Sequence, residues 1–297
     1  MSSIELPTEL ENYTLHPDAH IPPEIWKKMK HFVHVGNPNE WMSKIKLDGQ
    51  GIEYKDLPAA FKLNYELLLS SREGLDASLQ IMQRASNTYP YTETDVRKMY
   101  QFNEKLIMSH VLKTMGIFLT EIEKNIVIYA LRGAEFFEDM TKKYSKQSLK
   151  TEVKRIRVLD SNNEESYFVG IGEVPALEDG MESPKTFLMP DDCLSTGMTQ
   201  MALLERLFQQ GYKPEHVIMV FTIGTTAGIK YAYDKFSELV TKYNLNCRLD
   251  LQCGCLCRFV NDKMYLIDKN GDPVVNDMGD WNTSLDTVIH SPLTNEG

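Results

Sequence analysis

The 297-residue sequence lacks any apolar run approaching the roughly 20 residues that a membrane-spanning helix requires. Its first residues, MSSIELPTELENY, lack the basic start and the apolar stretch of a secretion signal. Cysteine is scarce, with five residues, which is too few for the dense disulfide framework of small secreted domains. We therefore expect no membrane contact and a reducing, cytoplasmic location.

An excess of positive charge is also lacking, because 32 lysines and arginines face 42 acidic residues, for a net charge of −10. This balance argues against a general nucleic-acid partner and against an anionic membrane surface. An acidic protein can still bind phosphates through backbone amides, a few basic side chains and a metal ion. The sequence also lacks a nucleophile-elbow motif, a Walker loop and a dinucleotide fingerprint.

What the chain does contain is a regular alternation of apolar strands and amphipathic helices between residues 125 and 250. This pattern predicts an α/β domain with a parallel sheet and helices on both faces. Residues 57–120 have helical spacing, and residues 1–55 read as an irregular arm that packs on something, because it carries Trp26 and Trp41. We predict a helical N-terminal extension or cap at residues 1–120 and the α/β domain at residues 121–297.

The stretch LMPDDCLSTGMTQMALLERL, residues 188–207, has carboxylate and hydroxyl side chains where one such strand meets its helix. Ligands of open α/β sheets lie beyond the carboxyl ends of the strands, and the amides of a helix N-terminus suit a phosphate. Asp191 and Asp192 would repel a phosphate, so we expect them to face ribose hydroxyls or Mg²⁺. A sugar phosphate meets both demands, although serine, threonine and aspartate before a helix can also simply cap it.

The segment PDDCLSTGMT resembles the signature of type I phosphoribosyltransferases, whose loop holds the 5′-phosphate and ribose of phosphoribosyl pyrophosphate (PRPP). The resemblance implies that Asp191 and Asp192 are catalytic carboxylates on the ribose side. It implies that Mg²⁺ reaches them indirectly, through PRPP. The 5′-phosphate would be bound by the five residues Ser195, Thr196, Gly197, Met198 and Thr199.

The strand IVIYAL runs into Arg132 and Gly133, followed by AEFF. In the uracil enzymes of the family the corresponding pyrophosphate loop reads close to Leu-Arg-Ala-Gly, and here the last two residues stand in the opposite order. The resemblance implies that Arg132 is catalytic and binds the leaving pyrophosphate together with Gly133. The alternative is an exposed arginine after a strand and a glycine that opens a helix.

Between these two loops, VKRIRVLD and ESYFVGIG alternate like strands and predict a hairpin over DSNNEE. The family has a mobile β hood in this region, with basic residues that close over pyrophosphate. The resemblance implies this role for Arg157, which Asp160 follows, with Lys154 and Arg155 as rivals. A solvated hairpin face is the alternative for each of them.

The segment YLIDKNGDPVVNDMGDW ends in a pattern similar to the Tyr-Ile-Val-Pro-Gly-Leu-Gly-Asp segment that pairs with uracil in the uracil phosphoribosyltransferases. Asn276 and Asp277 replace the proline and the first glycine. The resemblance implies a base site formed by Asn276, Met278, Gly279 and Asp280. A turn between a strand and the terminal segment is the alternative.

Cys253, Cys255 and Cys257 alternate along a predicted strand and would share one face. Their spacing differs from the paired cysteines of zinc sites, so we expect them to line the core beside the base pocket. His31 and His34 lie one turn apart on a possible helix, where we expect them to pack rather than bind metal.

The resemblance as a whole implies an Mg²⁺-dependent transfer of phosphoribose from PRPP to a uracil-like nucleobase, with release of pyrophosphate, in a homodimer. Two alternatives stay open. One is a PRPP- or nucleotide-binding regulatory protein of the same fold that has lost turnover. The other is an unrelated α/β protein, such as a Rossmann-type transferase.

Overall fold

The computed structural model describes residues 7–17, 19, 21, 23–36, 52, 54–72, 74–76, 78, 122–131, 134–142, 145–178 and 180–257. An eight-stranded sheet forms its centre, with the order β2-β5-β4-β3-β6-β7-β8 and with β1 paired to β4. The strands are β1 (Thr14–Leu15), β2 (His31–Gly36), β3 (Asn125–Leu131), β4 (Gln147–Leu159), β5 (Glu165–Ile171), β6 (Thr186–Leu194), β7 (His216–Thr225) and β8 (Arg248–Cys257).

Five of these strands run parallel to one another, in the order β4-β3-β6-β7-β8. Strand β5 is antiparallel to both β4 and β2, and β1 is antiparallel to β4. The sheet is therefore mixed and mostly parallel. This confirms the α/β class that the alternation of strands and helices predicted.

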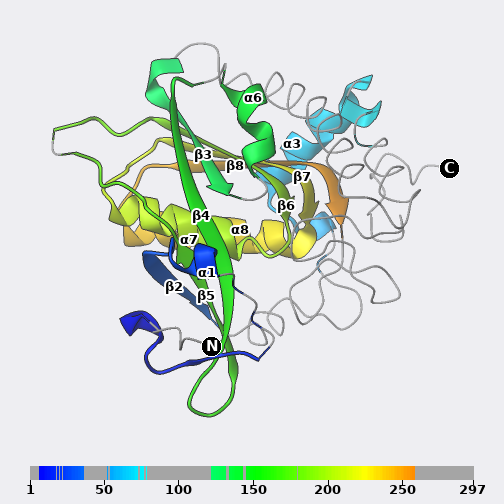
Figure 1. Ribbon diagram of the computed structural model, residues 1–297. Coiled ribbons are helices and arrows are strands. Elements are labelled where there is room, and N and C mark those ends of the chain that lie inside the picture. The colour runs from blue at the N-terminus through cyan, green and yellow to red at the C-terminus, as the bar shows by residue number, and fades with distance from the viewer. Residues whose placement is uncertain are drawn as a thin grey trace.

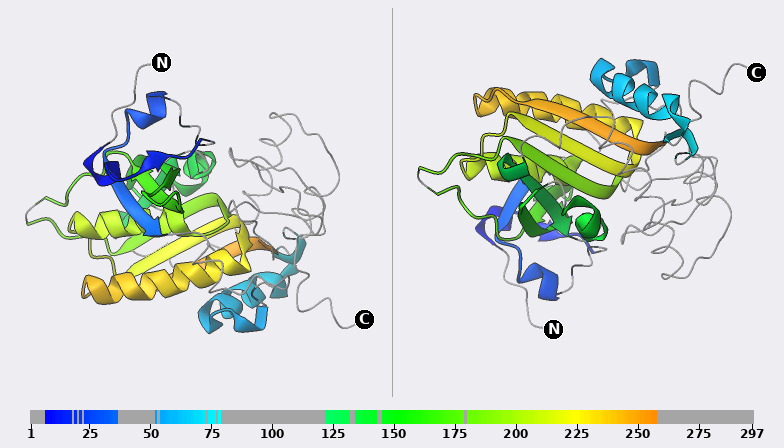
Figure 2. Two further views of the ribbon diagram at one scale, coloured as in Figure 1. Left: turned by 90° about the horizontal axis from the view of Figure 1, so that it is seen from below. Right: turned by 90° about the horizontal axis from the view of Figure 1, so that it is seen from above.

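Helices cover both faces of the sheet (Figure 2). Every residue of β7 is buried, as expected for a central strand with both faces covered. Helices α7 and α8 pack against each other on one face. On the other face, Asn64 of α3 donates to Asp250 of β8 at 3.5 Å, and Tyr129 of β3 bonds Thr141 of α6 at 2.5 Å. The α-helices are α1 (Pro23–Trp26), α3 (Ala59–Ser70), α6 (Glu138–Thr141), α7 (Met198–Gln209) and α8 (Thr226–Lys242).

Short 3₁₀ helices connect several of these elements: η1 (Thr8–Leu10), η2 (Tyr54–Asp56), η3 (Ile122–Lys124) and η4 (Ala134–Phe137). Helix α7 is followed by Gly211 in the left-handed conformation, with φ of 92°, which is common for the residue that follows a helix. Helix α3 ends at Ser70. Within the described part of the chain, none of the helices combines the length and the apolar character needed to cross a bilayer.

The order of the parallel strands contains one point at which the chain changes direction across the sheet. From β3 the chain moves outward to β4, and it later returns to the other side of β3 to form β6, β7 and β8. Since β3 and β6 are parallel neighbours, their carboxyl ends at Leu131 and Leu194 meet the same edge of the sheet. Ligands of doubly wound sheets bind at such a switch point.

The hairpin formed by β4 and β5 projects beyond this same edge (Figure 1). Residues 147–152 of β4 pair with β3, whereas residues 153–159 continue past the end of β3 and pair with β5. At the tip, the Asp160 carboxylate accepts from the amides of Asn162 at 2.8 Å and Glu164 at 2.9 Å. The hairpin predicted over DSNNEE is confirmed.

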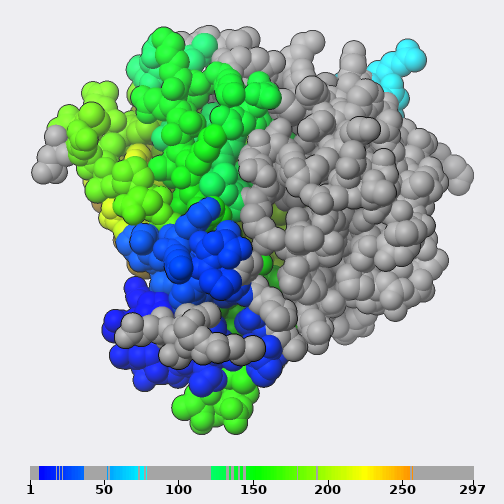
Figure 3. Space-filling model, viewed as in Figure 1, coloured from blue at the N-terminus to red at the C-terminus, as the bar shows by residue number. Residues whose placement is uncertain are grey.

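The N-terminal arm packs on this hairpin, and in Figure 3 its blue surface lies directly against the green of β4 and β5. A small separate core joins Leu10 to Ile156, Val158 and Phe168, with Trp26 packed at its border. The expectation that the arm packs on something is confirmed for the described residues. The placement of a domain boundary at residue 120 stays a prediction.

For residues 31–36, two predictions were wrong: the irregular arm, and the helix considered for His31 and His34. This segment forms strand β2, which pairs antiparallel with β5. Its sequence, HFVHVG, is rich in β-branched and aromatic residues, which favour strands. The free edge of β5 supplies the partner strand.

Candidate functional site

The loop between β6 and α7 consists of Ser195, Thr196 and Gly197, and it lies at the carboxyl edge beside the switch point. Gly197 is the N-cap of α7 and has φ of 74°, a left-handed conformation that costs an L-residue roughly 1–2 kcal/mol. A glycine has no side chain with which to cap the helix. The N-cap position of α7 therefore contributes no side-chain hydrogen bond to the first turn of the helix.

The side chains of this loop differ in how much they are exposed. Thr196 is buried, and its hydroxyl accepts from the Met198 amide at 3.3 Å. Met198 is buried in the main core, so any contact it makes with a phosphate would come from its backbone amide. Ser195 and Thr199 are partly exposed. The five residues predicted to bind the 5′-phosphate are therefore contiguous in space, with the helix N-terminus at their centre.

Asp191 lies near the end of β6 and is buried, with 9% of its surface exposed. Its carboxylate accepts a hydrogen bond from the side-chain amide of Gln200, in the first turn of α7, at 2.7 Å. Gln200 is itself buried, and sequence reasoning missed it. The nine-residue separation of Gln200 from Asp191 did not indicate a contact in the sequence, because the contact forms only when the chain turns back along the sheet. The backbone of Asp192 belongs to β6, and its side chain lies outside the described part.

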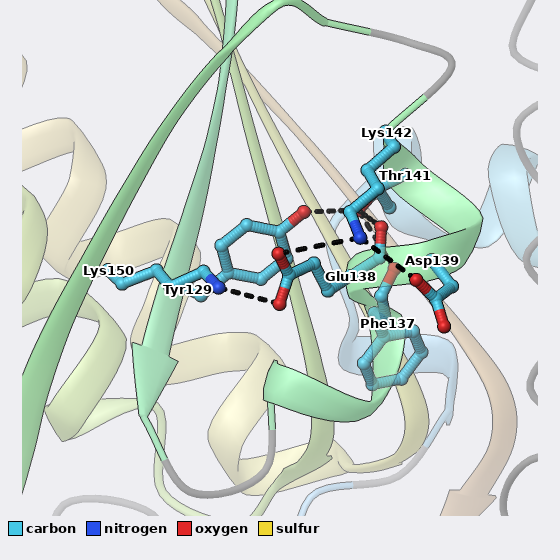
Figure 4. Close-up of polar contacts among 7 residues, drawn as sticks. All are labelled: Tyr129, Phe137, Glu138, Asp139, Thr141, Lys142 and Lys150. Carbon is cyan, nitrogen blue, oxygen red and sulfur yellow. Dashed lines mark hydrogen bonds and ion pairs between the residues drawn. The ribbon is translucent and has the colours of Figure 1, made fainter.

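Arg132 and Gly133, the predicted pyrophosphate loop, lie outside the described residues. The segments on either side of them are held firmly, as Figure 4 shows. Thr141 of α6 bonds Tyr129 of β3 at 2.5 Å and donates to the Phe137 carbonyl at 2.9 Å. These bonds fasten the segment after the loop back onto the strand before it.

An ion pair joins the same segment to the neighbouring strand. The Lys150 ammonium of β4 donates to Glu138 of α6 at 2.6 Å, and this hydrogen bond lowers the pKa of the Glu138 carboxyl. The 3₁₀ helix η4 contacts both β3 and β6. Both ends of the predicted pyrophosphate loop are thereby positioned beside the strand that carries Asp191.

Arg157 lies on the projecting hairpin, where it forms an ion pair with Glu165 of the opposite strand. Its guanidinium lies 6.0 Å from the centre of the buried Tyr167 ring, and that of Arg155 lies 5.4 Å from the same centre. His16 also contacts the Glu165 carboxylate, at 3.1 Å. Arg157 would have to share or exchange Glu165 to bind pyrophosphate, and its role stays a prediction.

The four residues predicted to bind the base, Asn276, Met278, Gly279 and Asp280, lie outside the described part of the chain. Cys253 is buried in β8, as expected for a core residue. Cys255 and Cys257 belong to the same strand, but their side chains lie outside the described part. Among the side chains that the structure describes, no group of three or more His, Cys, Asp or Glu gathers as a metal site.

No family model and no curated protein matches the chain. Several solved structures are similar to it. AQ2163 protein from Aquifex aeolicus has a TM-score of 0.42 and 18% identity, over 65% of this chain and 86% of that one. Adenine phosphoribosyltransferase (APRTase) from Giardia lamblia complexed with 9-deazaadenine has a TM-score of 0.36 and 14% identity, over 58% of this chain and 91% of that one.

Orotate phosphoribosyltransferase from Mycobacterium tuberculosis, in complex with PRPP, has a TM-score of 0.35 and 11% identity, over 62% of this chain and 90% of that one. All three TM-scores lie below 0.5. We therefore infer the function of this chain from its own residues and their arrangement.

Proposed function

We propose that this protein transfers phosphoribose from PRPP to a uracil-like nucleobase and releases pyrophosphate. The observation that carries the proposal is the loop Ser195–Thr199, which opens helix α7 with a left-handed glycine at the carboxyl edge of the sheet. The amides of the first helical turn and the positive end of the helix dipole suit the 5′-phosphate there. The resemblance of PDDCLSTGMT to the type I phosphoribosyltransferase signature indicates PRPP as the ligand.

Asp191 and Asp192 would face the ribose hydroxyls. Gln200 donates to one oxygen of the buried Asp191 carboxylate and so fixes its orientation toward the first turn of α7. Carboxylate oxygens are ligands that Mg²⁺ prefers, which fits a metal carried in by PRPP and held indirectly by these residues. When bound, Mg²⁺ supplies charge neutralisation for the departing pyrophosphate.

In the proposed reaction the bond between C1 of the ribose and the pyrophosphate oxygen breaks, and a base nitrogen bonds to C1. The loop after β6 holds the 5′-phosphate, which fixes the ribose in place. The aspartates stabilise the positive charge that develops on the ring. Arg132, Gly133 and Arg157 would bind the leaving pyrophosphate. The projecting hairpin would exclude water that could hydrolyse the sugar.

The finer parts of the proposal concern the acceptor and the assembly. Asn276, Met278, Gly279 and Asp280 would read the edge of the base, with uracil as the expected substrate class. We also propose a homodimer in a reducing cytoplasm. These parts rest on the sequence pattern alone.

The decisive experiment incubates the protein with PRPP, Mg²⁺ and a panel of nucleobases, with nucleotide detected by mass and pyrophosphate release measured in parallel. We expect turnover with a pyrimidine base. Binding of PRPP without turnover on any base would favour a regulatory protein instead. Absence of PRPP binding by calorimetry with Mg²⁺ would favour an unrelated α/β protein.

Substitution Asp192→Asn tests the site within the same assay. We expect it to lose most of the activity, because it removes the charge that would stabilise the ribose ring in the reaction. The free energy of unfolding should change little. Asp234→Asn is the control, since Asp234 lies on the exposed side of α8 and pairs only with its neighbour Lys230 among the ion pairs of the described residues. Normal turnover by Asp192→Asn would refute the assignment of the loop.

A further inference from the structure

The phosphate loop does not stand alone, because the start of the next strand-helix unit packs directly against it. Strands β6 and β7 are parallel, and their last registered pair joins Leu194 to Gly224. The next residue of each strand-helix unit is Ser195 in the loop and Thr225 at the N-cap of α8. Resting on the proposed function, we propose that Thr225 is a positioning residue that fixes the geometry of the phosphate loop.

The Thr225 hydroxyl makes two bonds that join the two units. It donates to the Ser195 carbonyl, and it accepts from the Gly228 amide at 2.8 Å. A hydroxyl has one hydrogen to donate, and that hydrogen is committed to the loop while the oxygen caps α8. Thr225 is fully buried. The Ser195 carbonyl therefore cannot reorient without losing its hydrogen bond from Thr225, whose oxygen is held in place by the amide of Gly228 in the neighbouring helix.

Two glycines allow the loop and the first turn of α8 to approach each other this closely. A Cβ atom on Gly228 would lie 2.5 Å from the Ser195 carbonyl oxygen and 3.0 Å from that of Leu194. A Cβ atom on Gly197 would lie 3.0 Å from the Gly228 carbonyl oxygen. These neighbours are backbone atoms, so no side chain can turn away to relieve the contact. The backbone of the loop is thus fixed from its outer side, by contact with α8.

This contact matters for the proposed chemistry because a phosphate is bound by the backbone of the loop. The amides of Ser195 through Thr199 can converge on one anion only in one loop conformation. Holding the Ser195 carbonyl sets the orientation of the peptide that follows it, whose amide belongs to Thr196. Thr225 touches neither substrate nor metal in this scheme and acts through the loop alone.

The test compares Thr225→Val with Thr225→Ser and with Thr226→Val. Thr226 is the matched control, because it is equally buried and its hydroxyl has no hydrogen-bond partner among the described residues. Thr225→Val is expected to speed hydrogen exchange at the amides of residues 195–199 about tenfold, the effect expected for one lost buried hydrogen bond. Thr225→Ser and Thr226→Val should exchange like the unmodified protein.

The second readout is PRPP affinity in the presence of Mg²⁺, together with KM and kcat where turnover occurs. We expect Thr225→Val to raise the Kd and the KM for PRPP about tenfold with little change in kcat, since the same bond is lost. Serine should restore both values. A merely structural role would lower the unfolding midpoint and leave the KM for PRPP unchanged.

Gly228→Ala retains Thr225 but places a Cβ atom 2.5 Å from the Ser195 carbonyl oxygen and 2.9 Å from the Thr225 hydroxyl, so it disturbs the same contact. It covers the case in which Thr225→Val does not fold. Like Thr225→Val, it should speed hydrogen exchange at the loop amides and weaken PRPP binding. The proposal is overturned if folded Thr225→Val matches Thr226→Val in both readouts. If the unmodified protein does not bind PRPP, the proposed function fails, and the exchange of the loop amides still decides whether Thr225 holds the loop.

Discussion

Gly197 combines a left-handed backbone with a close steric contact, and comparison with a second left-handed glycine separates the two effects. Gly197 and Gly180 both have left-handed backbones, with φ of 74° and 86°. A Cβ atom on Gly180 would meet nothing within 4 Å, whereas one on Gly197 would meet the Gly228 carbonyl at 3.0 Å. The two positions therefore share the backbone strain and differ in the steric contact.

We predict that Gly180→Ala lowers the free energy of unfolding by about 1 kcal/mol, the usual cost of a left-handed L-residue. Gly197→Ala should lower it by a further 1 kcal/mol or so, in line with other overpacked sites. It should also weaken PRPP binding, which Gly180→Ala should leave unchanged. Denaturant unfolding and calorimetry measure both effects. Equal losses of stability in the two variants would contradict the close contact.

At the scale of elements, the segment Phe137–Thr141 depends on the hydrogen bond between Tyr129 and Thr141. Both side chains are buried. We predict that Tyr129→Phe costs about 1 kcal/mol, because it removes one buried bond while Thr141 keeps its bond to the Phe137 carbonyl. Thermal unfolding measures the cost, and Tyr243→Phe is a control at a partly exposed tyrosine. No change in stability would show that the bond does not hold this segment.

The strand, loop and helix around residues 186–209 could be predicted from the sequence because their signals are local. The apolar run, the glycine and the amphipathic pattern are all contiguous there. Gln200 and Thr225 were missed because their partners, Asp191 and Ser195, lie 9 and 30 residues away. Strand β2 was missed because a six-residue run with two histidines takes its structure from the partner strand β5.

At the scale of the whole molecule, the two edges of the parallel sheet differ in their chemistry. The carboxyl edge carries the loop after β6 and the projecting hairpin. Near the opposite edge, buried His216 of β7 bonds Asp250 of β8 at 2.5 Å. Asn64 of α3 reaches the same carboxylate at 3.5 Å. These polar residues join a helix to the sheet and so bear on stability.

The Asp250 contacts predict a pH-dependent contribution to stability. The hydrogen bond from His216 is the largest cause that lowers the pKa of the Asp250 carboxyl below its ordinary value of 3.8. Since the folded state holds the proton more weakly than the unfolded state, the contribution is fully present above that value. It is lost as the pH falls through the lower pKa of the folded state.

We therefore predict that Asp250→Asn lowers the free energy of unfolding by about 1.5–3 kcal/mol near neutral pH, the range for a hydrogen bond to a charged group. The difference between the two proteins should narrow as the pH falls from about 4 toward about 3, where the unfolded carboxyl takes up a proton. Asp234→Asn, on an exposed pair of little energetic value, should change stability by less than about 0.5 kcal/mol at either pH. Denaturant titrations across this pH range measure the difference, and a gap that stays constant with pH would show that the charge on Asp250 does not fasten α3 and β7 to β8.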